Sequence, residues 1–333
     1  MSMYSLIYQI FFLLKRIERS RRAKNKSTNR MLRFLTGYVE WFFNVPSAKW
    51  YANHPNLQAR VTKVKRMQRV VVSLTTYPKR ISTVWLTIET LLRQSVKPDE
   101  IILWLAEPQF PEGLSELPSS VLRLQDRGLT IRFCDDLRSH KKYFYALQEY
   151  AEDLVILADD DMFYPRDTIQ KLLQMHKRWP EDICCITAQI IEPTFSAMPS
   201  VWRNPSPNEH TLQHTDRIQA FTGSGTLIPP KALPEEAFDK EAIRQLCPYA
   251  DDLWITFMAH RNGTRLSTLK KWRPFPVSIY GTAEGSLYYI NGEGNQNDVQ
   301  WKNLLEHYGT LPDHCGVAAE SEMKIEEHSR KDI

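Results

Sequence analysis

The sequence predicts an α/β fold with a mostly parallel sheet flanked by helices and a basic amphipathic helical extension in front. From about residue 69 onward, β-branched apolar runs alternate with segments of helical spacing. Strands separated by helices pair in parallel and are covered on both faces. A chain of 333 residues, 42% apolar and 25% charged, is long enough for one such globular domain plus an appendage.

The expected strands are short apolar runs bounded by turn residues. The first is rich in valine and ends at a Tyr-Pro turn, and the others follow at the spacing of β-α-β units. Three polar–apolar segments between them have helical periodicity, and Ser82 is the expected N-cap of the first helix. The strands are expected at 69–78, 100–106, 129–134, 154–158 and 182–191, and the helices at 81–94, 141–150 and 167–179. The tryptophans Trp85, Trp104 and Trp254 stand at helix or strand spacing and are expected to be core residues.

The N-terminal extension, residues 1–68, is strongly basic. Residues 1–69 hold 15 Lys and Arg against two acids, a net charge of +13, so the remainder carries −9 of the total of +4. The first apolar run is too short to span a bilayer, and its charge pattern does not fit a signal peptide. As a helix it would show Leu6, Ile10, Leu13, Leu14 and Ile17 on one face, followed by Lys15, Arg16, Arg19, Arg21 and Arg22.

A second apolar patch of the extension combines Leu35, Trp41, Phe42 and Phe43 with Arg30 and Arg33. Both segments fit interfacial helices on an anionic membrane surface, and ordinary packing against the domain is the alternative. No nucleic-acid-binding motif accompanies the charge, so no nucleic-acid partner is expected. Five cysteines without a CxxC pair favour a reducing compartment, hence a cytoplasmic protein, attached peripherally to the inner face of the cell membrane if the extension binds lipid. The polar tail, 313–333, is expected to be poorly ordered.

Three adjacent carboxylates, Asp159, Asp160 and Asp161, directly follow the apolar run 154–158. Ligands of parallel sheets bind beyond the carboxyl ends of the strands. If strand geometry persists, Asp159 and Asp161 point to one side and Asp160 to the other, and the first two form a hard-oxygen site for Mg²⁺ or Mn²⁺. The sequence has no glycine-rich phosphate loop, so metal and side chains would have to hold any diphosphate. The alternative is a solvated turn that caps the helix at 167.

An ordered set of motifs resembles bacterial glycosyltransferases with the GT-A fold over roughly residues 69–308. The motifs are VVSLTTYPKRI, TIETLLRQSVKPDEIILWLA, KKYFYALQEY, VILADDDMFYP, FTGSGTLIPP, PYADDLWI and NQNDVQW. The resemblance implies a catalytic domain over 69–312, a nucleotide-sugar donor, commonly a UDP-sugar, and a divalent cation. Asp159 and Asp161 correspond to the metal-binding pair, and Asp160 to a contact with ribose or the donor sugar.

The same resemblance implies roles for residues elsewhere in the domain. Asp252, with Asp251 as second choice, corresponds to the general base of inverting members, while helix capping is the alternative for both. Lys141 is the second choice for Lys142, and a tight turn is the alternative for residues 223–225. The remaining donor contacts are expected from Ser73, Thr75, Thr76, Tyr77, Arg80, Lys142, Gly223, Ser224 and Gly225, and from Asn297 or Asp298 in a mobile Gly- and Asn-rich segment.

The sequence therefore predicts a metal-dependent hexosyltransferase that moves a sugar from a nucleotide-sugar to a hydroxyl of a surface-glycan or lipid-linked acceptor. Two other classes remain open at this stage. One is a nucleotidyl or phosphoryl transferase that uses the same acidic metal site. The other is a non-catalytic glycan- or membrane-binding module on a degenerate GT-A fold. The donor sugar, the linkage and the stereochemical outcome are not encoded in these patterns.

Overall fold

The computed structural model describes residues 10–11, 13–14, 17, 26–54, 56–191, 196–205, 213–270, 273, 275–282, 287, 290–291 and 294–311. The predicted tail 313–333 and most of the first apolar segment of the extension lie outside these residues. The side chains of Phe42, Phe43, Arg30 and Arg33 also lie outside the described part of the structure. No helix in the described part of the chain has both the length and the apolar character needed to cross a bilayer.

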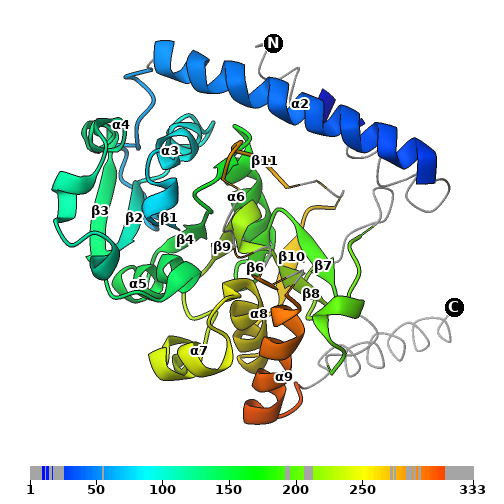
Figure 1. The fold of residues 1–333 in the computed structure, drawn as a ribbon. Helices are drawn as coiled ribbons and strands as arrows, with labels where there is room; N and C mark the ends of the chain where they lie inside the picture. Colours follow the sequence, from blue (N-terminus) through cyan, green and yellow to red (C-terminus); the bar gives the residue numbers. More distant parts are fainter. Residues whose placement is uncertain are drawn as a thin grey trace, which may run out of the picture.

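The described part of the chain forms a central seven-stranded sheet in the order β10-β6-β9-β4-β1-β2-β3 (Figure 1). Neighbouring strands are parallel except at β9, which runs antiparallel to both β4 and β6. The predicted mostly parallel sheet is confirmed. The strands are β1 (Val70–Thr75), β2 (Glu100–Ala106), β3 (Leu129–Cys134), β4 (Leu154–Leu157), β6 (Ile183–Cys185), β9 (Thr226–Ile228) and β10 (Leu266–Thr268), with two small sheets of β5 (Met162–Phe163) and β11 (Val277–Ser278), and of β7 (Ala188–Ile190) and β8 (Ile218–Ala220).

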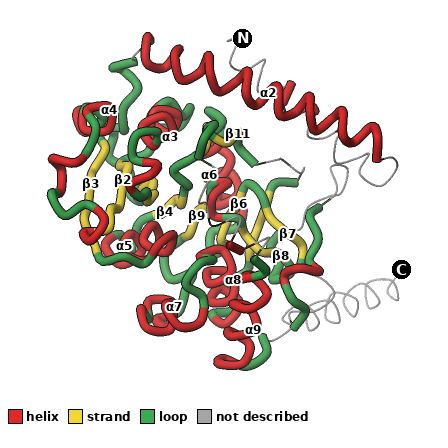
Figure 2. The backbone as a smooth tube through the Cα atoms, viewed as in Figure 1, coloured by secondary structure: helices red, strands yellow, loops and turns green. Residues whose placement is uncertain are grey.

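Helices cover both faces of the sheet (Figure 2). Side chains of α3, α4 and α6 pack on one face and those of α5, α8 and α9 on the other. The α-helices are α2 (Lys26–Asn53), α3 (Val84–Leu92), α4 (Ser119–Leu122), α5 (Lys141–Glu149), α6 (Thr168–Arg178), α7 (Lys240–Leu246), α8 (Asp251–Arg261) and α9 (Gln296–Tyr308). Short 3₁₀ turns lie at Pro78–Arg80 (η1), Glu107–Gln109 (η2), Gly113–Glu116 (η3), Gln125–Arg127 (η4), Arg138–His140 (η5), Pro199–Val201 (η6), Thr222–Ser224 (η7) and Glu235–Phe238 (η8).

Alternation along the central strands divides the core between the two faces. Val71 of β1 belongs to one apolar cluster, while Val70 and Val72 belong to the other, as period-two geometry requires. Trp104 and Trp254 are buried in the first cluster and Trp85 packs at the edge of the second, so all three tryptophans are core residues as predicted.

Two local predictions are wrong. The expected strand 182–191 is two short strands in different sheets, because the chain bends between Cys185 and Ala188. The N-cap of α3 is Thr83 instead of Ser82, and it makes no side-chain capping bond, because η1 continues the Tyr-Pro turn to Arg80 and delays the helix. Residues 291–301, described from the sequence as a mobile Gly- and Asn-rich segment, include the start of helix α9 at Gln296, and their mobility stays a prediction.

Helix α2 is the long helix of the extension, and in Figure 1 it runs across the molecule beside α3 and β11. Among its described side chains, the buried ones are Asn44, Ser47 and Tyr51, spaced as one helical face. Phe34, Tyr38 and Trp41, at i, i+4 and i+7, are exposed by 73%, 55% and 44%. Among the described side chains of α2, the polar Asn44 and Ser47 thus meet the domain beside Tyr51, while three aromatic rings face outward.

Tyr51 of α2 also belongs to a third, small apolar cluster, which includes residues of β5 and β11. Its buried members are Phe11, Tyr51, Leu86, Phe163, Val277 and Ile279. The cluster joins the extension to β5 and β11, the strands that immediately follow and flank the acidic residues. The extension therefore packs on the domain through at least this cluster, while the domain boundary at residues 68 and 69 stays a prediction.

Candidate active site

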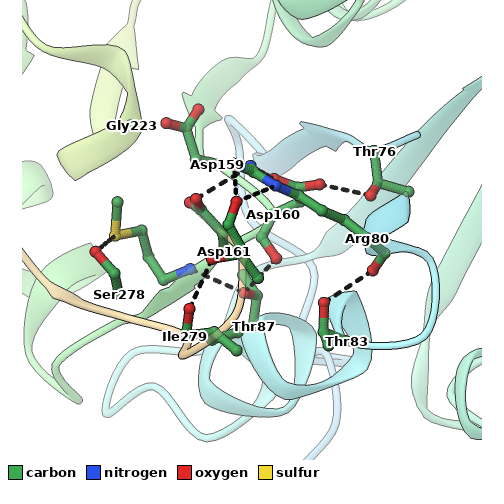
Figure 3. A network of polar contacts seen from close by, with 12 residues as sticks. Thr76, Arg80, Thr83, Thr87, Asp159, Asp160, Asp161, Gly223, Ser278 and Ile279 are labelled. Carbon is green, nitrogen blue, oxygen red and sulfur yellow. Dashed lines mark hydrogen bonds and ion pairs between the residues drawn. The ribbon is translucent and has the colours of Figure 1, made fainter. Parts of the chain in front are cut away.

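The acidic residues lie in a turn beyond the carboxyl end of β4, next to the end of β1. Strand β4 ends at Leu157, and β5 begins at Met162, so Asp159, Asp160 and Asp161 occupy the connection. Because β1 and β4 are parallel neighbours, Thr76 and Arg80 leave the sheet at the same edge. Figure 3 shows these side chains converging on one another.

Two threonines of α3 fix the backbone of this acidic turn. The Thr87 hydroxyl donates to the Asp160 carbonyl oxygen at 2.8 Å and accepts from the Met162 amide at 3.1 Å. One turn along, Thr90 Oγ1 accepts from the Tyr164 amide at 3.1 Å. Both threonines are buried, so these bonds are shielded from water and hold the turn in a defined shape.

Tyr164 ties the acidic turn to η7. Its hydroxyl accepts from the Asp159 amide at 2.8 Å and donates to the Gly223 carbonyl oxygen at 2.7 Å. A single fully buried phenol thus sets the distance between the start of the acidic turn and the glycine turn. The sequence analysis missed Tyr164, Thr87 and Thr90 as support for the site. The tyrosine stands inside the quoted motif VILADDDMFYP, and the threonines stand inside TIETLLRQ.

Asp160 and Asp161 share the guanidinium of Arg80. Arg80 Nη1 lies 2.6 Å from Asp160 Oδ1 and 3.1 Å from Asp161 Oδ2, and the Thr76 hydroxyl donates to Asp160 Oδ2 at 2.5 Å (Figure 3). The predicted alternation, with Asp159 and Asp161 on one side and Asp160 on the other, is wrong in this arrangement. Its premise fails because β4 ends before the acidic residues and the chain turns.

Asp159 faces the opposite cation, Lys142 of α5. Lys142 Nζ lies 2.5 Å from Asp159 Oδ1. The other carboxylate oxygen, Oδ2, lies where a β-carbon on Gly223 would be, at 1.9 Å from the ideal Cβ position. Glycine at 223 is thus required to leave room for the Asp159 carboxylate, which is a stronger constraint than the sugar approach that the sequence suggested.

Lys142 joins the acidic turn to helix α8. It is 2% exposed, and its Nζ also lies 3.0 Å from Asp251 Oδ2. Burial acts to lower the pKa of Lys142, but the carboxylates of Asp159 and Asp251 outweigh it and raise that pKa above its usual value. The lysine therefore stays charged, and its donors are directed at protein carboxylates. The predicted contact of Lys142 with a donor phosphate remains a prediction.

The two acids at the start of α8 have different environments. Asp251 Oδ2 accepts from the Thr222 hydroxyl at 2.8 Å, and although burial acts to raise its pKa, Lys142 and then His140 hold that pKa below its usual range. Burial, followed by the charge of Asp251, raises the pKa of Asp252 to about 7. Neither carboxylate makes a capping bond, and the N-cap position belongs to Ala250. The helix-capping alternative is thus not what the structure shows.

Five carboxylates meet two cations in this region. The acids are Asp159, Asp160, Asp161, Asp251 and Asp252, and the cations are Arg80 and Lys142, so full ionisation leaves three negative charges in excess. Burial, followed by the charge of Asp160, raises the pKa of Asp161 to about 7. An excess of buried negative charge disfavours ionisation unless a further cation enters.

Hard carboxylate oxygens and an excess of negative charge suit Mg²⁺ or Mn²⁺. Among the described residues, however, no three His, Cys, Asp or Glu side chains are arranged to hold a metal ion together. The residues therefore fit a divalent cation that takes one or two aspartates from the protein and its remaining oxygens from water or a phosphate ligand.

Residues after β1 line the Arg80 side of the acidic turn. Tyr77 Oη is buried and finds no hydrogen-bond partner in the described part of the chain, and Arg80 stacks over the tyrosine ring at 5.5 Å. A buried hydroxyl without a hydrogen-bond partner is unusual, and a polar group of a ligand placed here would supply that partner. Thr75 instead donates to the Trp104 carbonyl oxygen at 2.9 Å.

Other predicted contacts are occupied within the fold. The Ser73 and Ser224 side chains are fully buried, and they bond to Lys142 O at 2.5 Å and to Phe221 O at 2.9 Å, respectively. These hydroxyls are engaged within the fold, and a donor contact through either of them stays a prediction. Gly225 has a φ of 103°, so glycine there serves a turn. Asp298 accepts from the Ser200 amide at 2.8 Å and supports η6 rather than the acidic turn.

No protein-family model matches the chain, and no curated protein matches it either. Several solved structures are similar to it. S. aureus TarS has 15% identity, a TM-score of 0.41, and coverage of 62% of this chain and 59% of that one, so the chain spans less than two thirds of its length. The mannosyltransferase PcManGT from Pyrobaculum calidifontis in complex with GDP-Man and Mn²⁺ has 16% identity, a TM-score of 0.43, and coverage of 82% and 73%. A 4-diphosphocytidyl-2C-methyl-D-erythritol synthase has 9% identity, a TM-score of 0.41, and coverage of 66% and 96%.

Proposed function

We propose that the protein is a metal-dependent glycosyltransferase that moves a sugar from a nucleotide-sugar, a UDP-sugar in the first instance, to an acceptor hydroxyl. The observation that carries the proposal is the single buried network that links the acidic turn, Lys142 and the first turn of α8. This network combines a place for a cation with a carboxylate whose pKa is near neutral, at the carboxyl edge of a mostly parallel sheet.

The donor is expected to lie against the residues that follow β1. Tyr77 would use its unpartnered hydroxyl to bind the nucleoside, and Arg80 would turn part of its guanidinium from the carboxylates to the diphosphate. Asp159 and Asp161 would hold the divalent cation. When bound, that cation stabilises the negative charge of the departing nucleoside diphosphate. The hydrogen bond from Thr76 to Asp160 holds the acidic turn in place.

Asp252 is the proposed general base. Its pKa of about 7 suits proton abstraction from a hydroxyl near neutral pH, and the neighbouring Asp251 stays ionised because Lys142 compensates its charge. Two acids with separated pKa values thus take two roles. Asp252 takes the acceptor proton while Asp251 fixes Lys142 and Thr222. This assignment implies inversion at the anomeric carbon.

The acceptor is proposed to be a surface-glycan precursor or a lipid-linked saccharide at the cytoplasmic face of a membrane. Support comes from the exposed apolar face of α2, Phe34, Leu35, Tyr38 and Trp41, together with the net charge of +13 in residues 1–69. Exposed aromatic side chains beside cationic sequence are typical of helices that lie in the interface of anionic bilayers. Membrane attachment of this kind would bring a lipid-linked acceptor near the catalytic domain.

The proposal is tested by incubating the full chain with a panel of nucleotide-sugars, with and without Mn²⁺. The expected result is Mn²⁺-dependent release of a nucleoside diphosphate from one donor, lost in Asp161→Ala and in Asp252→Asn. Release of pyrophosphate would instead identify a nucleotidyl transferase. A chain that neither binds nor turns over any member of the panel would contradict catalysis altogether.

A further inference from the structure

Helix α2 is tied to the segment that follows β11 by one amide side chain. Asn44 Nδ2 donates to the Ser278 carbonyl oxygen at 3.0 Å, and Asn44 Oδ1 accepts from the Tyr280 amide at 2.7 Å. Asn44 is 6% exposed. The two bonds bracket Ile279 and imitate the pairing of a β-strand, so they fix both the position and the direction of the segment relative to the helix.

The segment held by Asn44 is in turn bonded to the acidic turn. The Ile279 amide donates to the Asp161 carbonyl oxygen at 2.7 Å (Figure 3). Just before it, Val277 and Ser278 of β11 pair antiparallel with Phe163 and Met162 of β5. The backbone of Asp161 is therefore positioned from the side of β11 as well as from α3.

The same segment also positions Arg80. The Thr282 carbonyl oxygen accepts from Arg80 Nε at 3.1 Å and from Nη2 at 2.8 Å, while Arg80 Nη1 faces Asp160 and Asp161. The Thr282 hydroxyl donates to the Ile279 carbonyl oxygen at 2.6 Å and closes the segment into a turn. Residues 277–282 thus reach the acidic turn at the Asp161 backbone and at the Arg80 side chain.

A second contact of α2 reaches β5 directly. The Tyr51 ring stacks on Phe163 with centroids 6.3 Å apart and planes 14° apart. Both rings are buried in the third cluster together with Val277 and Ile279. The helix therefore supports the acidic turn at two places, by hydrogen bonds at Asn44 and by packing at Tyr51.

We propose that Asn44 is a positioning residue of the donor and metal site, and that α2, besides the membrane contact proposed for its exposed face, is part of the framework of that site. The inference rests on the proposed function for what the site binds. Asn44 acts through residues 277–282 on Asp161 and Arg80 and touches no substrate itself. A buried amide that makes two bonds to one segment specifies a single register, which an apolar contact would not do.

Removal of the Asn44 amide is expected to weaken the site without unfolding the domain. Asn44→Ala leaves the Ser278 carbonyl and the Tyr280 amide without this partner and loosens residues 277–282. Loss of an outer support of a metal or phosphate site typically costs about 10- to 100-fold in affinity or activity. The expected change is a rise of that size in the dissociation constant of UDP with Mn²⁺ and in the donor KM, with a smaller change in kcat.

The experiment compares wild type, Asn44→Ala and Asn44→Asp with Asn53→Ala, a matched control at an exposed position of the same helix. Calorimetric titration with UDP in the presence of Mn²⁺ measures affinity, and thermal unfolding measures stability. Hydrogen exchange follows the Ile279 and Tyr280 amides. Asn44→Asp keeps the acceptor for Tyr280 but turns a carboxylate oxygen toward the Ser278 carbonyl oxygen in place of the donor, so its affinity is expected to fall below that of wild type.

Weaker UDP binding and faster exchange of Ile279 in Asn44→Ala, with Asn53→Ala unchanged, would support the proposal. Wild-type affinity in Asn44→Ala, or a lower melting temperature with no change in affinity or exchange, would overturn it. If Asn44→Ala does not fold, Asn44→Asp is judged by the same criteria. A wild-type chain that binds no nucleotide contradicts the proposed function, while exchange at Ile279 still decides whether Asn44 holds the segment.

Discussion

The ammonium group of Lys142 lies 2.5 Å from Asp159, and the lysine is buried, with only 2% of its surface exposed. The same group lies 3.0 Å from Asp251, which starts helix α8, 109 residues after Lys142. One buried cation therefore connects the proposed cation site with the proposed base. A substitution of Lys142 is expected to affect both Asp159 and Asp251, because each carboxylate relies on the lysine for charge compensation.

Lys142→Met is expected to abolish activity and to destabilise the fold. Removal of one partner from a buried ion pair leaves uncompensated charge and costs about 3–5 kcal/mol. Lys141→Met is the matched control, because Lys141 is equally buried but pairs with Asp136 outside the site. Thermal unfolding and donor turnover are measured on both. A control variant as inactive as Lys142→Met would show that general destabilisation, and not the link between the two carboxylates, explains the loss.

Asp252→Asn is expected to lower kcat by about 10²–10⁴-fold, the usual contribution of a general base. In the wild type, kcat should rise with pH through about 7, the raised pKa of Asp252, because the ionised form accepts the proton. A pH–rate profile with no transition near neutrality would contradict the assignment.

Asp252→Asn should also change stability in a pH-dependent way. A carboxyl group whose pKa is raised from 3.8 to about 7 binds a proton more tightly in the folded state, so stability falls as pH rises between these values. The asparagine variant does not ionise. It is expected to melt at a higher temperature than wild type at pH 8, with the difference vanishing near pH 4, as measured by thermal unfolding across that range.

The sheet could be predicted from the sequence because its signal is local. Valine-rich runs such as the one at Val70 and the turn at Pro78 specify strands whatever their neighbours do. The position of Asp251 beside Lys142 could not be derived from periodicity, since it depends on how α8 packs against α5. Motif order named both residues but not their contact. The role of Asn44 left no sequence signal, because nothing in an amphipathic segment says which polar residue meets a distant backbone.

The same contrast holds within the acidic run. The acidic run and its place after an apolar strand can be read from the sequence, while the orientation of each carboxylate depends on where the strand ends. Leu157 is the last residue of β4, and Arg80 then draws Asp160 and Asp161 together. If β4 had continued through Asp161, its side chains would have alternated as the sequence analysis expected. Local pattern therefore predicted the site but not its internal geometry.

Gly223→Ala is expected to damage cation binding more than stability. The new methyl group would fall 1.9 Å from Asp159 Oδ2, so the carboxylate has to move away from Lys142. Gly37→Ala in α2 is the control, because nothing lies within 4 Å of its Cβ position. Calorimetric titration of Mn²⁺ with UDP should show weaker binding for Gly223→Ala alone. Equal affinity in both variants would mean that Asp159 is not a ligand of the cation.

The exposed face of α2 is expected to bind vesicles that contain anionic lipid. The triple variant Phe34→Ser, Tyr38→Ser, Trp41→Ser removes three exposed rings while leaving the buried contacts of Asn44 and Tyr51 in place. Co-sedimentation with vesicles of phosphatidylcholine and phosphatidylglycerol should fall at least tenfold, because the loss of each ring removes apolar area that would be buried in the membrane interface. Turnover of a soluble donor should remain at the wild-type level, since these rings do not touch the acidic turn. Vesicles of phosphatidylcholine alone serve as the charge control and should bind the wild type weakly. Unchanged sedimentation of the triple variant would contradict the proposal that this face meets the membrane.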